Sequence, residues 1–419
     1  MAEVDAPPYL PDELITKILV RLPVKSLIRF KSVCKSWFSL ISDNHFANSH
    51  FQVTAATHTL RILFLTATPE FRYIAVDSLF TDDYNEPVPL NPNFPLPEFE
   101  FDLEIKASCR GFIYVHTCSE AYIWNPSTGF LRQIPFPPNV SNLIFYGFGY
   151  DESTDDYLVV SVYLVIIMNL GFIYVHTCSE AYIWNPSTGF LRQIPFPPNV
   201  SNLIFYGFGY DESTYDYLVV SVSYVYLGIF SLRANAWNEI VSPTHLPFCS
   251  KSSPFVYPLV ESVFNGAIHW LAFNYDTHEY LVVAFELVER KLVEIPLPDD
   301  FDHGYTVCGL WVCRGFLSLW VMVDEDTVDI WVMKEYKVQS SWTKTLVLTT
   351  YDTIHNVSLV CCTTSGDIVG TDSRTGLVRY DEEGEFLEHT YYCKDSRNGF
   401  RLAMYTESLL SLPSDNEEA

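Results

Sequence analysis

The residues that could carry chemistry are plentiful, because the chain of 419 residues contains 11 histidines and 51 aspartates and glutamates. Their spacing, however, fits no common catalytic motif. The zinc-protease pattern H-E-x-x-H, the hydrolase pattern G-x-S-x-G and the phosphate-binding P-loop do not occur in the sequence. Gly147 and Gly149 lack the third glycine of a dinucleotide-binding loop. The sequence therefore predicts no catalytic residue and no cofactor.

Potential metal ligands are also unfavourably spaced. His269 lies in an alternating apolar segment, where we expect a structural or surface histidine and not a metal ligand. His116 and His176 are the same residue in two copies of one segment, so they do not count as a pair. Cys361 and Cys362 are adjacent and would point to opposite faces of a strand, which argues against a shared metal ion. We therefore expect no metal site.

The cysteines and the first residues indicate a reducing compartment. No C-x-x-C pair occurs among the ten cysteines, which stand at positions 34, 109, 118, 178, 249, 308, 313, 361, 362 and 393. We expect free thiols. The first 25 residues mix acidic and basic side chains with apolar ones and contain no signal-peptide core. The expected location is the cytoplasm, the nucleus or both.

The charge balance excludes one large class of partners. With 25 lysines and arginines against 51 acidic residues, the formal net charge is −26, which would repel a phosphate backbone. We expect no nucleic-acid binding. Residues 1–50 carry six basic and five acidic side chains, so residues 51–419 carry 19 basic and 46 acidic ones, a net of −27. Two segments of different electrostatic character are therefore joined.

Strand-and-turn patterns fill most of the chain. Aromatic residues make up 16%, which favours pleated sheets over helical bundles. Six segments read as a strand, a polar turn and a second strand, namely residues 122–134, 182–194, 229–240, 284–295, 330–344 and 378–387. Several follow a strand that begins with glycine, as at Gly111, Gly266, Gly315 and Gly366. Units of about four strands recur every ~45–60 residues, which favours a β-propeller over a β-sandwich or an irregular β domain.

One segment is present twice. Gly111–Val162 recurs at Gly171–Val222 with one difference, Asp155 against Tyr215. Because ordinary structural repeats diverge, this near-identity indicates a recent duplication or a gene-assembly error. We expect the added copy to be extruded in part or to compete with its twin for one place in the fold, and the blade number to depend on it. The junction Tyr163–Leu170 is the expected weak point.

Two further segments need an assignment. Tyr157–Val175 contains no charged residue over 19 positions, a length that could cross a membrane. Its β-branched residues and the acidic residues before it favour two consecutive buried strands, so no membrane contact is expected.

Residues 81–104 contain five prolines among acidic side chains, which suits an extended connector better than a central strand.

The amino-terminal residues follow a different period. Apolar residues in 11–22 recur at helical spacing, Pro23 ends this helix and begins a second to about Phe30, and a third follows from about Val33 to Ile41. A module of about 40 residues buries too little apolar surface to be robust by itself. We therefore expect it to bind a partner and to fold poorly as the isolated segment 1–50.

These segments resemble a known family. LPDEL at 10–14, ILVRLPVKSL at 18–27 and RFKSVCKSW at 29–37 resemble the F-box. The later segments 123–129, 146–151, 265–271, 329–333 and 342–344 are similar to the F-box-associated, kelch-like domain of plant F-box proteins. The relatives in that family carry the duplicated segment once. The resemblance covers roughly residues 8–412.

That resemblance implies a non-catalytic, substrate-recognition subunit of an SCF-type (Skp/cullin/F-box) ubiquitin ligase. The F-box would dock on a Skp-family adaptor, and through it on cullin, while the β domain would bind an unknown target protein. The implied adaptor-binding residues, some of which must also form the core of the module, are Leu10, Pro11, Leu14, Ile18, Leu22, Pro23, Leu27, Val33, Cys34 and Trp37. The sequence identifies no target-binding residue. A non-ligase F-box scaffold and a kelch-like glycan-binding or enzymatic domain remain as alternatives.

The expected fold is thus mainly β, with a small three-helix F-box module followed by a β-propeller-like (kelch-like) domain of four-stranded units. The F-box module spans residues 8–50, and the first strands with the proline-rich connector span 51–104. The propeller-like domain spans 105–395 and includes both copies, 111–162 and 171–222. A carboxy-terminal segment with an acidic tail spans 396–419.

Overall fold

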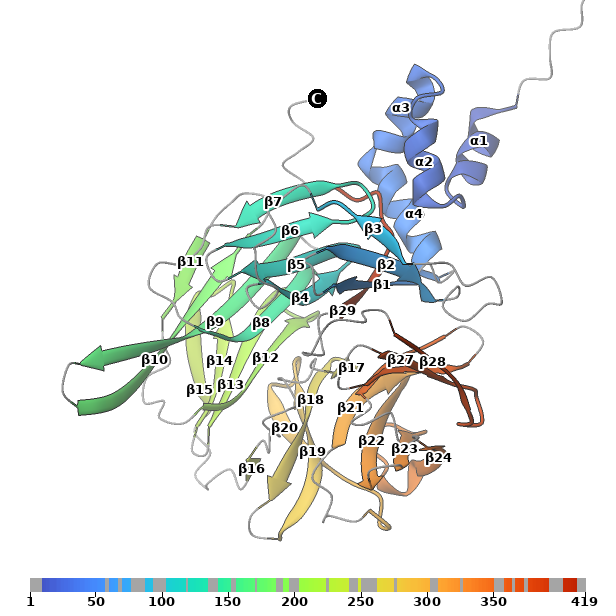
Figure 1. Cartoon of the computed structure of the whole chain (residues 1–419). Helices are drawn as coiled ribbons and strands as arrows, with labels where there is room; N and C mark the ends of the chain where they lie inside the picture. Colours follow the sequence, from blue (N-terminus) through green and yellow to red (C-terminus); the bar gives the residue numbers. More distant parts are fainter. Residues whose placement is uncertain are drawn as a thin grey trace, which may run out of the picture. The chain divides into compact units, whose positions relative to one another are not determined.

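A computed structural model gives the fold of the chain (Figure 1). It describes residues 10–56, 60–66, 70–76, 87–92, 103–117, 120–134, 142–151, 156–169, 172–185, 191–195, 203–223, 226–240, 248–249, 262–274, 277–301, 308–324, 327–349, 358–363, 366–372, 376–391 and 402–412. Two compact units contain these residues. The first consists of Met1–Phe136, Pro186–Gly189 and Arg401–Ala419, and the second of Pro137–Asn185 and Phe190–Phe400.

The amino-terminal module of the first unit is helical. Its helices are α1 (Asp12–Leu19), α2 (Val24–Phe30), α3 (Lys35–Ser42) and α4 (Asn44–Ala56). Pro11 and Pro23 stand directly before α1 and α2, where a proline fits because the first amides of a helix have no intrahelical acceptor. The expected boundaries of the second helix are therefore confirmed, whereas α1 ends earlier than residue 22.

The expectation of three helices is wrong, because α4 is a fourth. The sequence of α4 places polar His50 and Thr54 on the buried side with Phe46, so the apolar stripe that identifies a helix is interrupted. Tertiary contacts satisfy these polar groups. His50 Nε2 lies 2.9 Å from the carbonyl oxygen of Leu22, and the Thr54 hydroxyl donates to the His50 carbonyl oxygen at 2.9 Å. Asp43, which accepts the Phe46 amide at 3.0 Å, was the available signal for the start of α4.

In the described residues, seven antiparallel sheets follow, each with four strands paired in a row, which is the arrangement of a propeller with seven four-stranded blades. In the first unit, sheet A contains β29 (Leu402–Thr406), β1 (Leu60–Leu65), β2 (Phe71–Ala75) and β3 (Val88–Leu90) in this order, and sheet B contains β4 (Leu103–Cys109), β5 (Phe112–Thr117), β6 (Ala121–Asn125) and β7 (Phe130–Ile134). The mainly β class and the four-stranded units are therefore confirmed.

The second unit contains five sheets. Sheet C is β8 (Asn142–Asp151), β9 (Asp156–Asn169), β10 (Phe172–Trp184) and β11 (Leu191–Ile194). Sheet D is β12 (Leu203–Asp211), β13 (Asp216–Ser223), β14 (Tyr226–Ser231) and β15 (Ala236–Ile240). Sheet E is β16 (Phe248–Cys249), β17 (Ser262–Phe264), β18 (Ala267–Asn274), β19 (Glu279–Glu286) and β20 (Lys291–Pro296). Sheet F is β21 (Cys308–Cys313), β22 (Phe316–Asp324), β23 (Thr327–Met333) and β24 (Trp342–Thr349), the last preceded by a 3₁₀ turn at Gln339–Ser341. Sheet G is β25 (Ser358–Cys362), β26 (Ile368–Thr371), β27 (Gly376–Tyr380) and β28 (Phe386–Tyr391).

The strand predictions are largely confirmed. All six predicted strand pairs are present, as β6–β7, β10–β11, β14–β15, β19–β20, β23–β24 and β27–β28. Tyr157–Val175 contributes to β9 and β10, so the choice of strands over a membrane helix is correct. Among the described residues, no helix has both the length and the apolar character needed to span a bilayer. In the described part of the proline-rich segment, β3 is the edge strand of sheet A and pairs with β2.

The core lies between successive sheets within each unit. In the first unit, Leu63 and Phe71 of sheet A pack with Ile113 and Trp124 of sheet B. In the second unit, four apolar clusters join sheet C to D, D to E, E to F and F to G. Trp124 and Trp184 are fully buried at equivalent positions of β6 and β10, as the sequence repeat predicts, whereas Trp237 is partly buried. The repeated tryptophans therefore serve packing.

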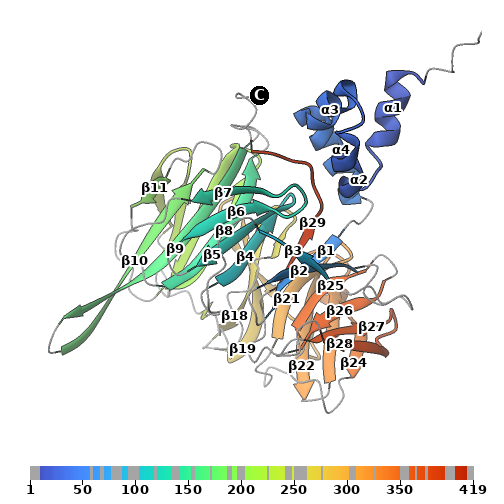
Figure 2. The same ribbon diagram turned by 45° about the horizontal axis from the view of Figure 1, so that its top comes forward.

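The carboxy-terminal residues belong to the first sheet. The sequence assigned residues 396–419 to a separate segment, but β29 pairs antiparallel with β1, from Leu60 opposite Thr406 to Phe64 opposite Leu402 (Figure 2). Sheet A therefore joins the two ends of the β domain. Such pairing requires residues about 340 positions apart, which a local sequence pattern does not reveal.

The duplicated segment is distributed over three sheets. The first copy supplies β5–β7 to sheet B and β8 with most of the sheet-forming part of β9 to sheet C. The second copy supplies β10 and β11 to sheet C and β12 and β13 to sheet D. The 60 added residues thus account for one sheet. In the described residues, β8 pairs with β9 as far as Leu164 and β11 pairs with β10 as far as Ala181, and beyond these positions β9 and β10 pair with each other as a two-stranded ribbon (Figure 1, Figure 2).

Deleting residues 111–170 tests whether this copy is surplus. The deletion joins Arg110 to Gly171 and restores the sequence of β4–β7, because residues 171–194 repeat residues 111–134. It also removes the two-stranded ribbon and its unpaired edges. We expect the shortened protein to be at least as soluble as the full chain and to unfold at the same or a higher temperature, as measured by scanning calorimetry. A lower midpoint, or loss of the cooperative transition, would show that the copy is an integral blade.

Candidate functional site

The helical module exposes large apolar side chains. In the described part of the chain, fifteen large hydrophobic residues are exposed, and six of them lie within residues 10–38. These six are Leu10, Leu14, Ile18, Ile28, Val33 and Phe38, with exposed fractions from 38% to 60%. Single exposed hydrophobic residues are ordinary, but a concentration of this size on a small helical module indicates a protein-binding surface.

Helix α1 has two apolar sides. Leu14 and Ile18 are one helical turn apart and are both exposed, whereas Leu19 is buried against the rest of the module. Because only one side of an amphipathic helix is needed for the core, the Leu14 and Ile18 side is available to a partner. Lys17 of α1 and Arg21, two residues after the end of α1, are exposed, as are Asp12 and Glu13 in the first turn of the helix.

The structure divides the ten residues proposed for the adaptor contact into three groups. Seven are exposed, namely Leu10, Pro11, Leu14, Ile18, Pro23, Val33 and Cys34. Leu22 and Trp37 are half-buried, and Leu27 is fully buried. Leu27 can act only as core of the module, beneath the surface formed by the others.

Two of the less exposed residues hold the helices together. The Leu22 carbonyl oxygen is hydrogen-bonded to His50 of α4. The centroids of the Trp37 and Phe30 rings are 5.5 Å apart. Cys34 precedes α3, and its sulfur accepts the Trp37 amide at 3.5 Å as a weak cap. These residues therefore shape the surface as well as bordering it.

The sequence prediction missed two exposed residues, Ile28 and Phe38. Each directly follows a predicted residue, Leu27 or Trp37, and neither is among the F-box motif positions from which the predicted set was taken. A short helix has few buried positions, so an apolar residue directly beside a core residue indicates an exposed apolar side chain. This was the available signal for Ile28 and Phe38.

Within the first unit, α4 connects this surface to the β domain. Arg110, in the turn between β4 and β5, donates to the Asn48 side-chain oxygen at 2.6 Å, and its guanidinium group lies 5.2 Å from the centre of the Phe51 ring. Ser411 and Asn44 are joined by a side-chain hydrogen bond of 3.2 Å. The helix is thus attached both to sheet B and to the residues that follow β29.

The residues after β29 are themselves held by sheet B. The Asn125 amide donates to the carbonyl oxygens of Ser408 and Leu410 at 3.2 and 3.1 Å. Leu409, Leu410 and Leu412 are buried. This carboxy-terminal segment, residues 407–412, therefore connects sheet A, sheet B and α4.

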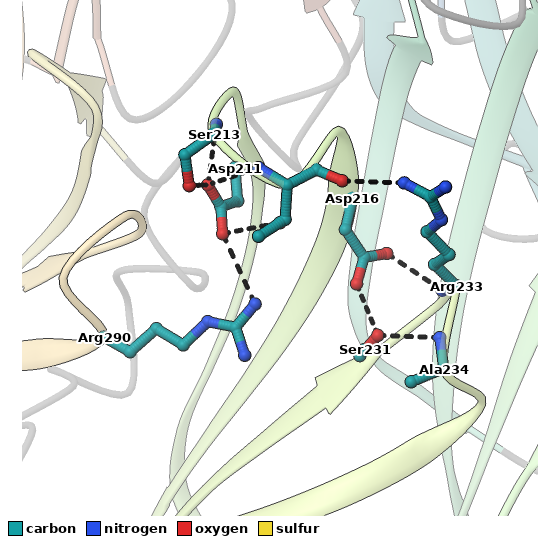
Figure 3. A network of polar contacts seen from close by, with 8 residues as sticks. Asp211, Ser213, Asp216, Ser231, Arg233, Ala234 and Arg290 are labelled. Atoms are coloured by element: carbon teal, nitrogen blue, oxygen red, sulfur yellow. Dashed lines mark hydrogen bonds and ion pairs between the residues drawn. The ribbon is translucent and has the colours of Figure 1, made fainter.

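A polar network around Asp211 and Asp216 in the second unit serves structure (Figure 3). Asp211, at the end of β12, accepts hydrogen bonds from the hydroxyl groups of Ser213 and Thr214 at 2.6 and 2.7 Å, and Arg290 of the β19–β20 turn lies 3.4 Å away. Asp216, at the start of β13, accepts from the Arg233 amide at 2.9 Å and from the Ser231 hydroxyl. Both carboxylates are therefore occupied by neighbours that fix two turns.

The surroundings of Asp211 act on its ionisation in opposite directions. Burial by itself raises the pKa of this carboxyl group, but hydrogen bonds from Ser213, Thr214 and Arg290 favour the charged form and together hold the pKa below its ordinary value of 3.8. The charged form is therefore the one that the fold stabilises.

The other residues singled out for chemistry have structural surroundings. His269 is buried and its Nε2 lies 2.8 Å from the Tyr336 hydroxyl, so it is a core histidine. A Cβ atom at Gly147 would lie 2.6 Å from the Phe208 ring, so this glycine permits close packing of sheets C and D. Among the described residues, no group of three potential metal ligands is found. Asn139, Asn199 and Asn356, which form N-x-S sequons, lie outside the described residues.

Comparison with known protein families gives two matches. The F-box domain matches residues 8–48. The F-box associated beta propeller domain matches residues 163–401, which is more than half of the chain. The chain belongs to this family of F-box proteins. The resemblance inferred from the sequence is confirmed, both for the amino-terminal module and for the β domain.

Curated relatives of this F-box protein agree in domain composition. It is 26% identical to the F-box/kelch-repeat protein At3g23880 of Arabidopsis thaliana, over 99% of this chain and 98% of the relative. It is 24% identical to F-box protein CPR1 of the same plant, over 96% of this chain and 88% of that relative. The propeller match begins at residue 163, so it includes the second copy, 171–222, and leaves the first outside.

The Asp211 network predicts a pH-dependent stability. Asp211→Asn removes the charge and leaves one acceptor oxygen, so we expect a loss of about 1–3 kcal/mol at pH 7. Because the folded-state pKa is lowered, the stabilisation is complete above the ordinary pKa of 3.8 and decreases as the pH falls through the lower folded-state value. Thermal unfolding of both proteins between pH 3 and 7 measures this.

The matched control is Asp300→Asn, at an exposed aspartate of the same unit. We expect it to leave the unfolding temperature within error at every pH. If Asp211→Asn behaves like Asp300→Asn at pH 7, the network contributes nothing to stability.

Proposed function

We propose that this F-box protein is the substrate-recognition subunit of an SCF-type ubiquitin ligase. The helical module docks on a Skp-family adaptor, and through it on cullin, and the β-propeller binds the target protein. The single observation that carries the proposal is the apolar surface of the helical module, where Leu10, Leu14, Ile18 and Val33 are exposed within an F-box sequence. F-box proteins are in general non-catalytic adaptors, which fits a receptor that leaves catalysis to other subunits.

Energetics support a protein partner for this surface. Burial of apolar surface contributes about 25 cal/mol for each square ångström, so four to six large side chains supply several kcal/mol when covered. A few side chains near the centre of an interface account for most of its affinity. Lys17, Arg21 and Lys25 are exposed in the same module, which favours an adaptor that presents acidic groups around an apolar centre.

The β domain supplies the second binding function in this proposal. Residues 51–419 have a formal net charge of −27, from 19 basic and 46 acidic side chains. A domain of that charge associates fastest with a target that presents positive potential. We place the assembly in the cytoplasm or the nucleus, since ten cysteines without a C-x-x-C pair suit a reducing compartment.

Affinity purification of the tagged full chain from plant cells tests the assembly. Recovery of a Skp-type adaptor together with cullin supports a ligase receptor. Recovery of the adaptor without cullin would instead indicate a non-ligase scaffold, and recovery of neither would contradict the adaptor assignment.

A single substitution tests the surface itself. Ile18→Asp places a carboxylate where the adaptor would bury an apolar side chain, and its desolvation costs several kcal/mol. We expect adaptor affinity to fall by at least about 100-fold, measured by titration calorimetry with the purified full chain.

Two further variants separate contact from folding. Val288→Asp changes a propeller residue with an exposed fraction of 52%, against 53% for Ile18, and should leave adaptor binding unchanged. Leu27→Ala removes core packing, so it should lower helical content as well as binding. Retained affinity in Ile18→Asp would exclude α1 from the interface.

A further inference from the structure

One sequence adopts two different structures in this chain. Residues 112–125 and 172–185 are identical. In the first copy they form two strands, β5 and β6, joined by a turn in which Thr117 and Glu120 are hydrogen-bonded through their backbones at 2.7 Å. In the second copy Phe172–Trp184 is one continuous strand, β10, so the positions equivalent to that turn are extended. Context, and not local sequence, therefore decides between the two.

The second half of the segment keeps one neighbouring strand in both copies and changes the other. On one side the pairing is the same, since Ala121–Trp124 face Ile134–Leu131 and Ala181–Trp184 face Ile194–Leu191. On its other side, however, Ile123 pairs with Tyr114 of its own hairpin, whereas Ile183 pairs with Val160 of β9. In the second copy, residues 159–162 of β9 thus lie beside residues 181–184. In a hairpin like that of the first copy, residues 173–176 would lie there instead.

The first copy is held in its hairpin by the rest of the first unit. Arg110, directly before the copy, is bonded to Asn48 of α4. At Gly111, which has a φ of 86°, an added Cβ would lie 2.5 Å from Ser408 of the carboxy-terminal segment. In the second copy Leu170 stands at the position of Arg110. No second helix α4 or carboxy-terminal segment exists in the sequence to repeat these contacts.

The second copy nevertheless contains every strand needed for the alternative. In the sequence, residues 163–169 precede the second copy at the same distance as β4, residues 103–109, precedes the first copy. At the tip of the ribbon Asn169 pairs with Phe172, as Cys109 pairs with Phe112 in sheet B. Beyond the tip the register differs, because Ile167 faces His176 while the equivalent Ala107 faces Tyr114. The ribbon therefore departs from the hairpin by a shift of two to three residues that begins at a bulge.

We propose that residues 163–185 form a two-state element that exchanges between the ribbon β9–β10 and a hairpin like β4–β5–β6. In the exchange, residues 173–176 replace residues 159–162 beside residues 181–184. The two arrangements contain equally many paired residues between the strands concerned, so neither is favoured by backbone pairing alone. Two packings of one sequence that differ by a small free energy constitute a conformational switch.

The switch changes which residues form a sheet edge. In the ribbon state, no third strand among the described residues pairs with Val165–Asn169 or Phe172–Cys178. In the hairpin state Phe172–Cys178 would lie between two strands, as β5 does, whereas Val165–Asn169 would be an edge strand, as β4 is. The exchange therefore covers the edge formed by Phe172–Cys178.

Disulfide trapping in the full chain distinguishes the two registers. Residue 164 faces Ser179 in the ribbon. In the hairpin it would face His176, because the equivalent Glu104 faces His116. The ribbon variant is Leu164→Cys with Ser179→Cys, and the hairpin variant is Leu164→Cys with His176→Cys, both with Cys178→Ser. Facing residues of antiparallel strands are close enough for a disulfide.

Diamide serves as the oxidant, because it takes up the two hydrogens that a pair of thiols loses when the disulfide forms. We expect both variants to form their disulfide, the hairpin variant up to about tenfold more slowly, with peptide mapping to confirm the linked residues. Glu104→Cys with His116→Cys is the matched control in the first copy, where only the hairpin register exists. If the control forms its disulfide and the hairpin variant does not, the proposal is overturned.

Hydrogen exchange on the unsubstituted chain gives an independent test that needs no cysteine pair to fold. The peptides to compare are 107–117 and 167–177. Residues 111–117 and 171–177 are identical, so their intrinsic exchange rates are equal. The four residues before them differ, so mass spectrometry distinguishes the two peptides. We expect faster exchange in the second copy, because its strands must separate to change register. Equal or greater protection in the second copy would contradict a two-state element.

Discussion

The pairing of the last strand with the first is the interaction on which the rest of the first unit depends. β29 completes sheet A beside β1, and Arg61 of β1 forms an ion pair with Glu407 at 3.3 Å directly after β29. The carboxy-terminal segment that follows is bonded to Asn125 of sheet B and to Asn44 of α4. If β29 were released, three elements would lose a shared support, because the same six residues contact all of them.

This arrangement explains how a small helical module remains ordered while exposing apolar side chains. The module has few buried residues, among them Leu19, Val24 and Leu27. Its fourth helix compensates by contacts outside the module, through Asn48 and Phe51 to Arg110. A module anchored in this way can leave Leu14 and Ile18 for a partner, since its own stability does not depend on covering them.

The duplicated segment shows how far context determines strand structure. The same residues form a hairpin where β4, Arg110 and Ser408 adjoin them, and a single long strand where β9 adjoins them. Strand propensity and alternation are identical in the two copies, so the difference comes from the neighbours that supply hydrogen bonds along the edge. A propeller tolerates such an insertion because each sheet packs mainly on the sheets next to it.

The sequence by itself determined the elements whose cause is local. Helical spacing and Pro23 identified α2, alternation and turn residues identified six strand pairs, and the motif around Leu10–Trp37 identified the F-box. The tertiary structure decided what depends on distant neighbours. It placed β29 beside β1, made a helix of Asn44–Ala56 by accepting His50 and Thr54 into the core, and separated buried Leu27 from exposed Leu14 and Ile18. A local pattern records which side chains are apolar, but only packing determines which of them are already covered and which are left for a partner.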